Sequence, residues 1–179
     1  MKIVHALNFY GDNLGTQEVV RNLVRCELDA GYNPEIVTSD LSKNTANDIC
    51  KVKRLPARLT ISRIPFTPSL VRYILKKDAD IFHLHGPLPW FDSVLSLKRL
   101  VHGNSKFIYR IQNLTFEHQL YSRFFGYGYQ NIALRIAARA ADVVITMTKT
   151  LAQLLSGIFN PQKTAIIRNG IDAGEYTVS

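Results

Sequence analysis

Short apolar runs alternate with longer helical patterns along this chain of 179 residues, and this alternation constrains the fold more than any other feature. Seven runs are rich in β-branched and apolar residues and short enough to be buried strands. They cover residues 2–7, 35–38, 51–55, 80–85, 106–111, 142–146 and 164–168.

Helical patterns fill most of the intervals between these runs. In the first interval, apolar residues recur at the spacing of one helical face from Val19 to Leu28. Thr16 is the expected N-cap of this helix, and Gly31 is expected just past its C-terminal end. Further helical patterns cover residues 69–77, 88–102, 115–141 and 149–159.

Strands that alternate with helical segments of this length imply right-handed crossovers and a parallel sheet covered on both faces. We therefore predict a single α/β domain, a three-layer α/β/α sandwich with a mostly parallel sheet. In such sheets, ligands bind outside the carboxyl ends of the strands. The loops nominated by this rule are residues 8–16, those from 39 onward, 85–89, 112–118 and 146–150.

Composition narrows the setting of the protein. No apolar run is long enough to span a membrane, and the apolar run in residues 1–8 is too short for a secretory signal. Cys26 and Cys50 have neither the density nor the spacing of a disulfide framework or a zinc site. We therefore expect a cytoplasmic protein with reduced cysteines.

A basic stretch from residue 51 to residue 77 contains no Asp or Glu and accounts for the whole formal charge of +8. Its cations are interleaved with apolar residues. One interpretation is a surface that binds an anionic acceptor or, peripherally, the inner face of the membrane. The other is a solvated basic face, and the sequence leaves both open. The cations are Lys51, Lys53, Arg54, Arg58, Arg63, Arg72, Lys76 and Lys77.

A loop with two glycines, Gly11 and Gly15, lies between the first predicted strand and its helix. The N-terminus of a helix favours an anion, so the loop is either a phosphate-side binding loop or a plain structural turn. Its spacing fits neither the dinucleotide fingerprint nor the Walker loop. We therefore predict no flavin, nicotinamide or other cofactor.

Four segments resemble family 4 glycosyltransferases and occur in the order and spacing of that family. They are Gly31-Tyr-Asn-Pro-Glu-Ile-Val-Thr-Ser39, Asp80-Ile-Phe-His-Leu-His-Gly86, Arg139-Ala-Ala-Asp-Val-Val-Ile-Thr146 and Lys163-Thr-Ala-Ile-Ile-Arg-Asn-Gly-Ile-Asp172. The last is similar to the family's hinge into a second domain. The resemblance thus covers residues 1–179 as the N-terminal, acceptor-side Rossmann-like domain of a GT-B fold, without the C-terminal nucleotide-sugar domain.

The resemblance implies a transferase of the hexosyltransferase class, acting in polysaccharide biosynthesis. It would move a sugar from a nucleotide-sugar, held by the absent domain, to a glycan or lipid-linked acceptor. Because the charge-stabilising groups belong to that absent domain, we expect residues 1–179 to be inactive alone. The alternative is a non-enzymatic Rossmann-like module that binds phosphate, nucleotide or nucleic acid through its basic face. No nucleic-acid motif is recognisable, so we predict no nucleic-acid partner.

Three residues are predicted to be catalytic: His85, Gln112 and His118. The resemblance places Gln112 where many relatives carry a histidine. Because an amide cannot take up a proton near neutral pH, an acid–base role at Gln112 is in doubt. His118 is the nearest replacement, although a solvent-facing helical histidine is an equal alternative. His83 and His85 alternate on one strand and share a face, and we expect one buried and His85 facing the crevice, as a ligand contact or a structural polar group.

Substrate binding is assigned to Gly15, Thr16, Arg110 and Asn113. Thr16 stands in the place of a second family glycine, which makes the loop less permissive. His85 and His118 have no Asp, Glu or Cys at ligand spacing beside them, so we predict no metal site.

Overall fold

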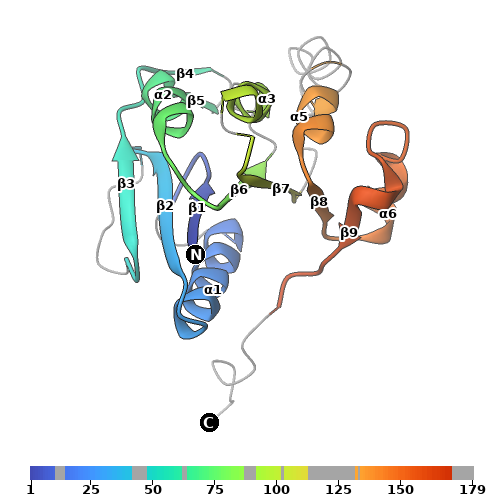
Figure 1. Cartoon of the computed structure of the whole chain (residues 1–179), viewed down its shortest axis with the longest axis horizontal. Coiled ribbons are helices and arrows are strands. Elements are labelled where there is room, and N and C mark those ends of the chain that lie inside the picture. The colour runs from blue at the N-terminus through green and yellow to red at the C-terminus, as the bar shows by residue number, and fades with distance from the viewer. Residues whose placement is uncertain are drawn as a thin grey trace.

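Seven parallel strands form the central sheet in the order β3-β2-β1-β6-β7-β8-β9 (Figure 1). The structure is a computed structural model, and it describes residues 1–10, 15–41, 48–61, 64–86, 92–101, 103–112, 132 and 134–170. The strands are β1 (Lys2–Ala6), β2 (Asn33–Ser39), β3 (Lys51–Leu55), β6 (Ile81–Gly86), β7 (Lys106–Ile111), β8 (Val143–Thr146) and β9 (Thr164–Ile166). Each of the seven predicted strands is confirmed within one or two residues at either end.

The direction in which strands are added reverses beside β1. The chain first builds outward from β1 to β2 and β3, and then returns to place β6 on the other side of β1. Ala6 is accordingly the register partner of both Val37 on β2 and Leu84 on β6. In open parallel sheets this reversal creates a crevice at the carboxyl ends of the two strands, which here are β1 and β6.

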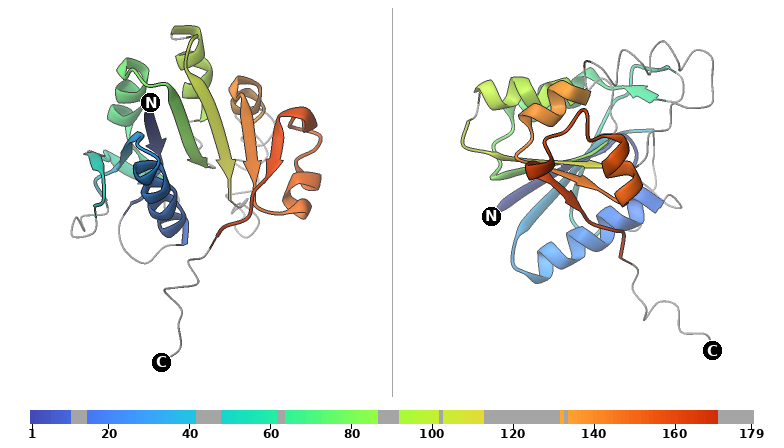
Figure 2. Two further views of the ribbon diagram at one scale, coloured as in Figure 1. Left: turned by 60° about the horizontal axis from the view of Figure 1, so that its bottom comes forward. Right: turned by 90° about the vertical axis from the view of Figure 1, so that its right-hand side faces the viewer.

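Helices cover both faces of the sheet (Figure 2). α2, α3 and α5 form one layer, and α1 lies on the opposite face. α6 lies against β8 and β9. Among the described residues, the helices are α1 (Gly15–Asp29), α2 (Pro68–Lys76), α3 (Asp92–Val101), α5 (Leu134–Ala140), α6 (Lys149–Leu154) and a 3-10 turn (Pro161–Lys163). The predicted α/β/α arrangement with a parallel sheet is therefore confirmed.

The apolar core is divided by the sheet. The larger part lies beneath α2, α3 and α5, where the fully buried rings of Phe82 and Phe107 stack with centroids 5.6 Å apart. The smaller part lies beneath α1 and includes Val20 and Val24 from its predicted apolar face. Burial on both faces explains why the strand sequences are nearly continuous apolar runs.

The two ends of α1 test the predicted caps. Gly31 adopts a φ of 77°, and its N–H donates to the carbonyl of Leu28 at 2.9 Å while that of Tyr32 donates to Glu27 at 2.9 Å. These two bonds form a Schellman motif, which confirms Gly31 as the residue that ends the helix. The predicted N-cap is wrong, because the helix begins at Gly15 and Thr16 lies inside its first turn.

Two further elements differ from the sequence prediction. Between the prolines of residues 56–68 the chain forms an antiparallel pair, β4 (Leu59–Ile61) and β5 (Ile64–Phe66), which the broken pattern did not reveal. α6 ends at Leu154 rather than Phe159, because the following turn, which contains Gly157, buries Leu155 and Phe159. Of the helical stretch predicted for residues 115–141, residues 115–131 lie outside the described part of the chain.

Among the described residues, none of the helices has the length and apolar character needed to cross a membrane.

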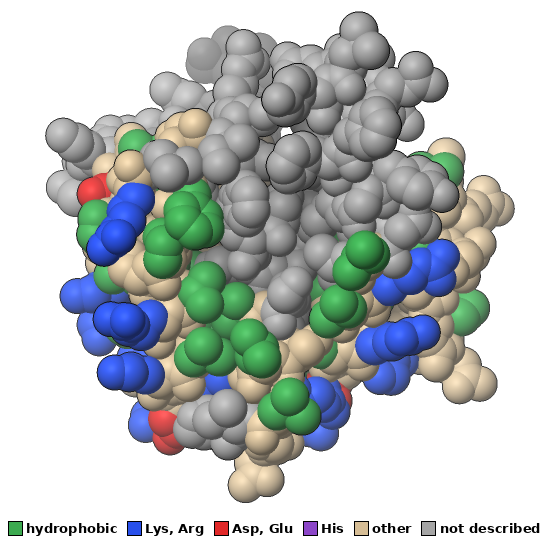
Figure 3. Space-filling view, turned by 90° about the horizontal axis from the view of Figure 1, so that it is seen from above, with side chains coloured by type: hydrophobic (Ala, Val, Ile, Leu, Met, Phe, Trp, Pro, Cys, Tyr) green, Lys and Arg blue, Asp and Glu red, His purple; other side chains and the backbone are tan. Residues whose placement is uncertain are grey.

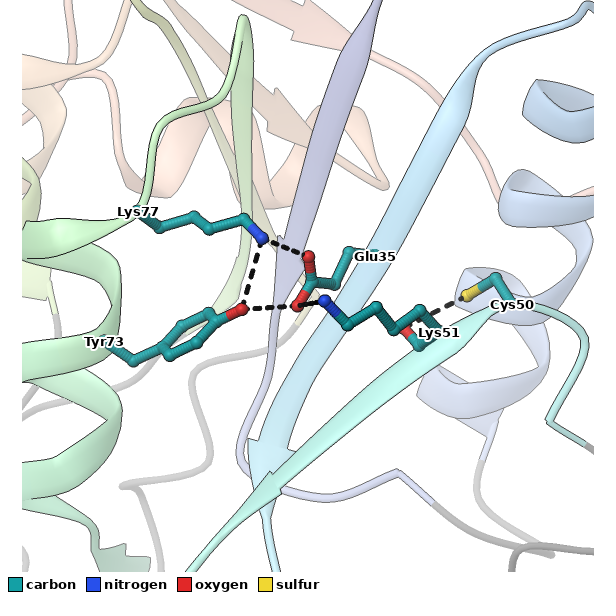
Figure 4. Close-up of polar contacts among 5 residues, drawn as sticks. All are labelled: Glu35, Cys50, Lys51, Tyr73 and Lys77. Carbon is teal, nitrogen blue, oxygen red and sulfur yellow. Dashed lines mark hydrogen bonds and ion pairs between the residues drawn. The ribbon is translucent and has the colours of Figure 1, made fainter.

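Glu35 is a buried carboxylate on β2 that is held by three residues, two from α2 and its C-cap and one from β3 (Figure 4). The Tyr73 hydroxyl donates to Glu35 Oε1 at 2.5 Å, the Lys77 ammonium donates to Oε2, and Lys51 Nζ lies 3.4 Å from Oε1. Burial alone would raise the pKa of Glu35. Hydrogen bonds from Lys77 and Tyr73 and the charges of Lys77 and Lys51 outweigh burial and hold the pKa below its ordinary value of 4.5.

Glu35→Gln is expected to lower the free energy of unfolding at pH 7 by about 2 kcal/mol, because it removes the anion while leaving its cations in place. The figure is below that of a fully buried pair because the Lys77 side chain is 25% exposed. The stability contributed by the ionised Glu35 carboxylate is present above pH 4.5 and is lost as the pH falls through its lowered pKa. Urea denaturation of the parent protein and the variant at pH 7 measures the difference in the free energy of unfolding. The matched control is Glu18→Gln, at an i,i+3 pair with Arg21 in which the Glu18 side chain is 45% exposed, and it should change stability by less than about 0.5 kcal/mol. Equal losses in the two variants would contradict the assignment.

Candidate functional site

Polar side chains gather at the carboxyl ends of β6 and β7, beside the reversal of strand order. His85 and Arg110 are register partners on these two strands, and the N–H of Gln112 approaches the carbonyl of Gly86 at 3.4 Å. The Thr16 hydroxyl donates to Gln112 Oε1 and so joins the first turn of α1 to the end of β7. The fold therefore brings together Thr16, His85, Arg110 and Gln112, which are 96 residues apart at the extremes.

Gln112 has a free donor as a result of this contact. Its Oε1 accepts from Thr16, while its Nε2 is buried and has no hydrogen-bond partner. A buried amide N–H without a partner is costly, and such groups in native structures commonly mark a ligand or water position. Gly15, the other predicted residue of this turn, is exposed, and a Cβ placed on it would meet nothing within 4 Å. Packing of the described residues therefore does not require a glycine at position 15.

Arg110 carries a buried charge. Its residue is 5% exposed, its Nη2 donates to Asn169 Oδ1 at 2.7 Å, and its Nε has no partner. Burial lowers the pKa of this guanidinium, and no ion pair links it to an acidic residue in the part of the chain that the structure describes. Asn169 follows β9, in the segment that resembles the family's hinge.

Three histidines stack behind these residues, on the side of the sheet that α1 covers. His5 on β1 joins His83 and His85, with ring centroids 5.2 Å, 5.4 Å and 4.2 Å apart for the pairs 5–83, 5–85 and 83–85. All three are buried, with exposures of 0%, 4% and 3%. The expectation that His85 faces the crevice while its neighbour is buried is therefore wrong, because α1 covers the face that both share.

Two hydrogen bonds connect His5 to α1 and to β6. His5 Nε2 lies 2.8 Å from Glu27 Oε2, and His5 Nδ1 lies 3.1 Å from His85 Nε2. Since a carboxylate only accepts, the proton between His5 and Glu27 lies on His5 Nε2, while the donor and the acceptor of the contact between His5 and His85 depend on the tautomers of the two rings. His85 Nδ1 and His83 Nε2 are buried and have no hydrogen-bond partner among the described residues.

Burial is the main reason that the pKa values of His83 and His85 lie well below 6.5, and the nearby charges of the histidine cluster and Arg110 act in the same direction. The two rings are therefore neutral at pH 7. Sequence reasoning missed His5 and Glu27, whose importance depends on the pairing of β1 with β6 and on the packing of α1.

A metal could be considered only at this cluster among the described residues, since one ring nitrogen from each histidine lies within 4.8 Å of the others. However, the rings are stacked rather than convergent on one point, and His5 already uses both nitrogens in hydrogen bonds. The arrangement is suited to hydrogen bonding by neutral imidazoles. The absence of a metal site stays a prediction.

Three cations of the basic stretch are paired with acidic residues. Arg54 forms two hydrogen bonds with Asp48, at 2.7 Å and 2.9 Å, and Lys51 and Lys77 are paired with Glu35. These acids lie outside the stretch in the sequence and reach it only in the fold. Among the described residues, five of its cations are exposed: Lys51, which is paired with Glu35, and Lys53, Arg58, Arg72 and Lys76.

On the face seen from above, Lys and Arg side chains lie on either side of a central group of apolar side chains (Figure 3). α3 contributes exposed apolar residues, with Leu97 51% and Leu100 84% exposed. This face thus combines apolar and basic side chains. Three predicted residues, Arg63, Asn113 and His118, lie outside the described part of the chain.

Comparison with protein families gives one match: a model described as Glycosyltransferase Family 4 matches residues 15–175. No curated protein matches the chain significantly.

Solved structures resemble the chain in fold. Sucrose-phosphate synthase from Thermosynechococcus elongatus superposes with a TM-score of 0.70 at 16% identity, over 97% of this chain and 49% of its own. A glycosyltransferase from Rickettsia africae has a TM-score of 0.60 at 15% identity, over 98% and 45%. An alpha-glucosyltransferase solved with UDP and DNA has a TM-score of 0.61 at 10% identity, over 98% and 42%. The chain therefore spans about half the length of these proteins.

Proposed function

Because this chain belongs to glycosyltransferase family 4, we propose that it forms the acceptor-side wall of the cleft in a GT-B enzyme. The enzyme moves a sugar, of the hexosyl class, from a nucleotide-sugar to a glycan or lipid-linked acceptor. The observation that carries this proposal is the convergence of Thr16, Arg110 and Gln112 at the carboxyl ends of the strands beside β1. This is the place where open α/β sheets bind their ligands.

The chemistry of these side chains is binding rather than proton transfer. Gln112 Nε2 is free to donate to a substrate oxygen, and the first turn of α1 adds the positive end of a helix dipole. Neither Gln112 nor the fully packed His85 offers a group that exchanges protons near pH 7. We therefore assign Gln112 to orienting a substrate and His85 to supporting the cleft from behind.

The opposite wall of the cleft is proposed to be formed by a second, C-terminal domain of the enzyme. The three glycosyltransferase-fold structures are each about twice as long as this chain, which supports a C-terminal domain that holds the nucleotide-sugar. Groups that neutralise the departing diphosphate would belong to that domain, so residues 1–179 are proposed to lack activity alone.

The site of action is proposed to be the cytoplasmic side of a membrane with anionic lipids. Exposed cations such as Arg72 and Lys76 on α2 and exposed leucines such as Leu97 and Leu100 on α3 support peripheral contact. A lipid-linked acceptor would then be presented at the same surface.

Transfer assays with several nucleotide-sugars test the function. Residues 1–179 alone should give no turnover above background, whereas a protein that joins them to a C-terminal nucleotide-sugar domain should release nucleotide in the presence of acceptor. In that protein, Gln112→Ala is expected to lower kcat/KM by about 10- to 100-fold, the effect of losing one ligand hydrogen bond. Gln162→Ala, at an exposed position of the 3-10 turn, is the matched control and should leave kcat/KM unchanged. Turnover by residues 1–179 alone, or an unchanged Gln112→Ala variant, would contradict the assignment.

A further inference from the structure

We propose that Arg110 and Gln112 form a subsite for one oxyanion, a carboxylate or phosphate group carried by a substrate of the cleft. The inference rests on the proposed function, because it takes the carboxyl ends of β6 and β7 as the substrate-binding edge. It adds the chemical class of the group that is bound there.

Arg110 carries a buried charge that no acidic residue neutralises in the described part of the chain. A guanidinium that is 5% exposed normally lies against a carboxylate, because an unpaired buried charge is strongly unfavourable. Within the described part of the chain, its one hydrogen-bond partner is the neutral amide of Asn169, and Nε has none. A ligand that brings a negative charge would supply the missing partner.

The surroundings do not supply that charge. His83 and His85, which lie next to Arg110 on the sheet, are neutral, and Glu27 is engaged by His5 on the far side of the stack. The first turn of α1, reached through the contact of Thr16 with Gln112, contributes a positive partial charge. The described residues around Arg110 therefore leave the local potential positive.

Arg110 and Gln112 together supply a pair of free hydrogen-bond donors. Arg110 and Gln112 are two residues apart along β7 and its end, so their side chains leave the strand on the same side. Each has a buried donor nitrogen that has no partner among the described residues, Arg110 Nε and Gln112 Nε2. The two oxygens of a carboxylate, or two of the three of a phosphate, can accept from both donors. Guanidinium groups are well suited to such planar recognition of anions.

A purely structural role for Arg110 is the competing interpretation, since its bond to Asn169 connects β7 to the segment after β9. Anchoring and anion binding depend on different residues. Anchoring needs Asn169, whereas anion binding needs the guanidinium charge and Gln112.

Binding of inorganic pyrophosphate and of sodium glucuronate to residues 1–179, measured by isothermal titration calorimetry, tests the subsite. Glucose is the neutral control for glucuronate. We expect saturable binding of one equivalent of at least one anion, weakened at least tenfold by Arg110→Gln and several-fold by Gln112→Leu, which keeps the charge. Asn169→Ala and Arg139→Gln, the latter at an exposed arginine of α5, should bind as the parent protein does. Tighter binding of pyrophosphate would point to the donor diphosphate, and tighter binding of glucuronate to an acidic acceptor.

Several outcomes would overturn the inference. They are no saturable binding of either anion, glucose binding as well as glucuronate, or equal binding by the parent protein and Gln112→Leu. If Arg110→Gln does not fold, as judged by circular dichroism, Arg110→Lys and Gln112→Leu carry the test. The binding assay needs no transfer reaction. Anion binding without any transfer by the two-domain protein would count against the proposed function alone, and transfer without anion binding would count against the subsite alone.

Discussion

Acidification below pH 6.5 is expected to destabilise this domain steeply, with the free energy of unfolding falling by up to about 2.7 kcal/mol per pH unit. The cause is the pair His83 and His85, whose pKa values in the folded chain lie well below 6.5 because both rings are buried beside each other and beside Arg110. In the unfolded chain each imidazole takes up a proton as the pH falls through 6.5, while in the folded chain it does not. Proton uptake therefore stabilises the unfolded state, and stability that is present above pH 6.5 is lost below it.

Urea denaturation at intervals between pH 7.5 and pH 5.5 measures this slope. His83→Leu is the informative variant, because His83 Nε2 is buried without a partner and its removal leaves no acceptor unpaired at that atom. The variant should show about half the slope, about 1.4 kcal/mol per pH unit, since one titrating group remains. Glu35 and Asp142 do not contribute to this slope, because their pKa values are lowered from 4.5 and 3.8 and they take up protons only at lower pH. Identical slopes in the parent protein and His83→Leu would show that the acid sensitivity has another origin.

Gly86→Ala is expected to lower the free energy of unfolding by about 2 to 3 kcal/mol. Gly86 ends β6 at the edge of the candidate site, and a Cβ placed on it would lie 2.7 Å from Cε2 and 2.9 Å from the hydroxyl oxygen of Tyr109. The Tyr109 ring is fully buried in the larger part of the core, so it cannot move aside without disturbing its neighbours. The added methyl group therefore overpacks the sheet where the substrate edge begins.

A double-mutant cycle isolates this clash. In a Tyr109→Leu background the ring atoms that obstruct the methyl group are gone, so adding Gly86→Ala should cost less than about 1 kcal/mol. Gly157→Ala serves as the glycine control, because a Cβ at that position meets nothing within 4 Å. Thermal or urea unfolding of the four variants measures the coupling. A cost for Gly86→Ala that is the same in both backgrounds would assign the loss to the backbone rather than to Tyr109.

The elements that were predicted well are those whose own residues indicate the secondary structure they form. Residues 51–55 form β3 over the predicted range, and Gly31 ends α1 through the left-handed conformation that glycine adopts most easily. Elements with mixed local signals were predicted less well. The prolines around β4 and β5 concealed a hairpin, and α6 stopped where burial of Leu155 and Phe159 favoured a turn over further helix.

The candidate site was predicted in part. Thr16, Arg110 and Gln112 were nominated because they follow strands or begin a helix at the expected edge, and the fold does bring them together. The stack of His5 with His83 and His85, and the role of Glu27 behind it, were not predicted. Nothing near residue 5 in the sequence indicates a partner 80 residues away, and nothing near residue 27 indicates a partner 22 residues away.

The sequence by itself determined the sheet-forming and helix-forming segments and, through its resemblance to a family, the half of a cleft to which they belong. It could do so because burial on two faces and helical amphipathicity leave local periodic patterns. Only the tertiary structure decided which charges are neutralised, as with Lys77 and Glu35, and which remain unpaired, as with Arg110. These pairings depend on strand order, register and helix placement, and a shift of one residue in register would move every such side chain to the other face.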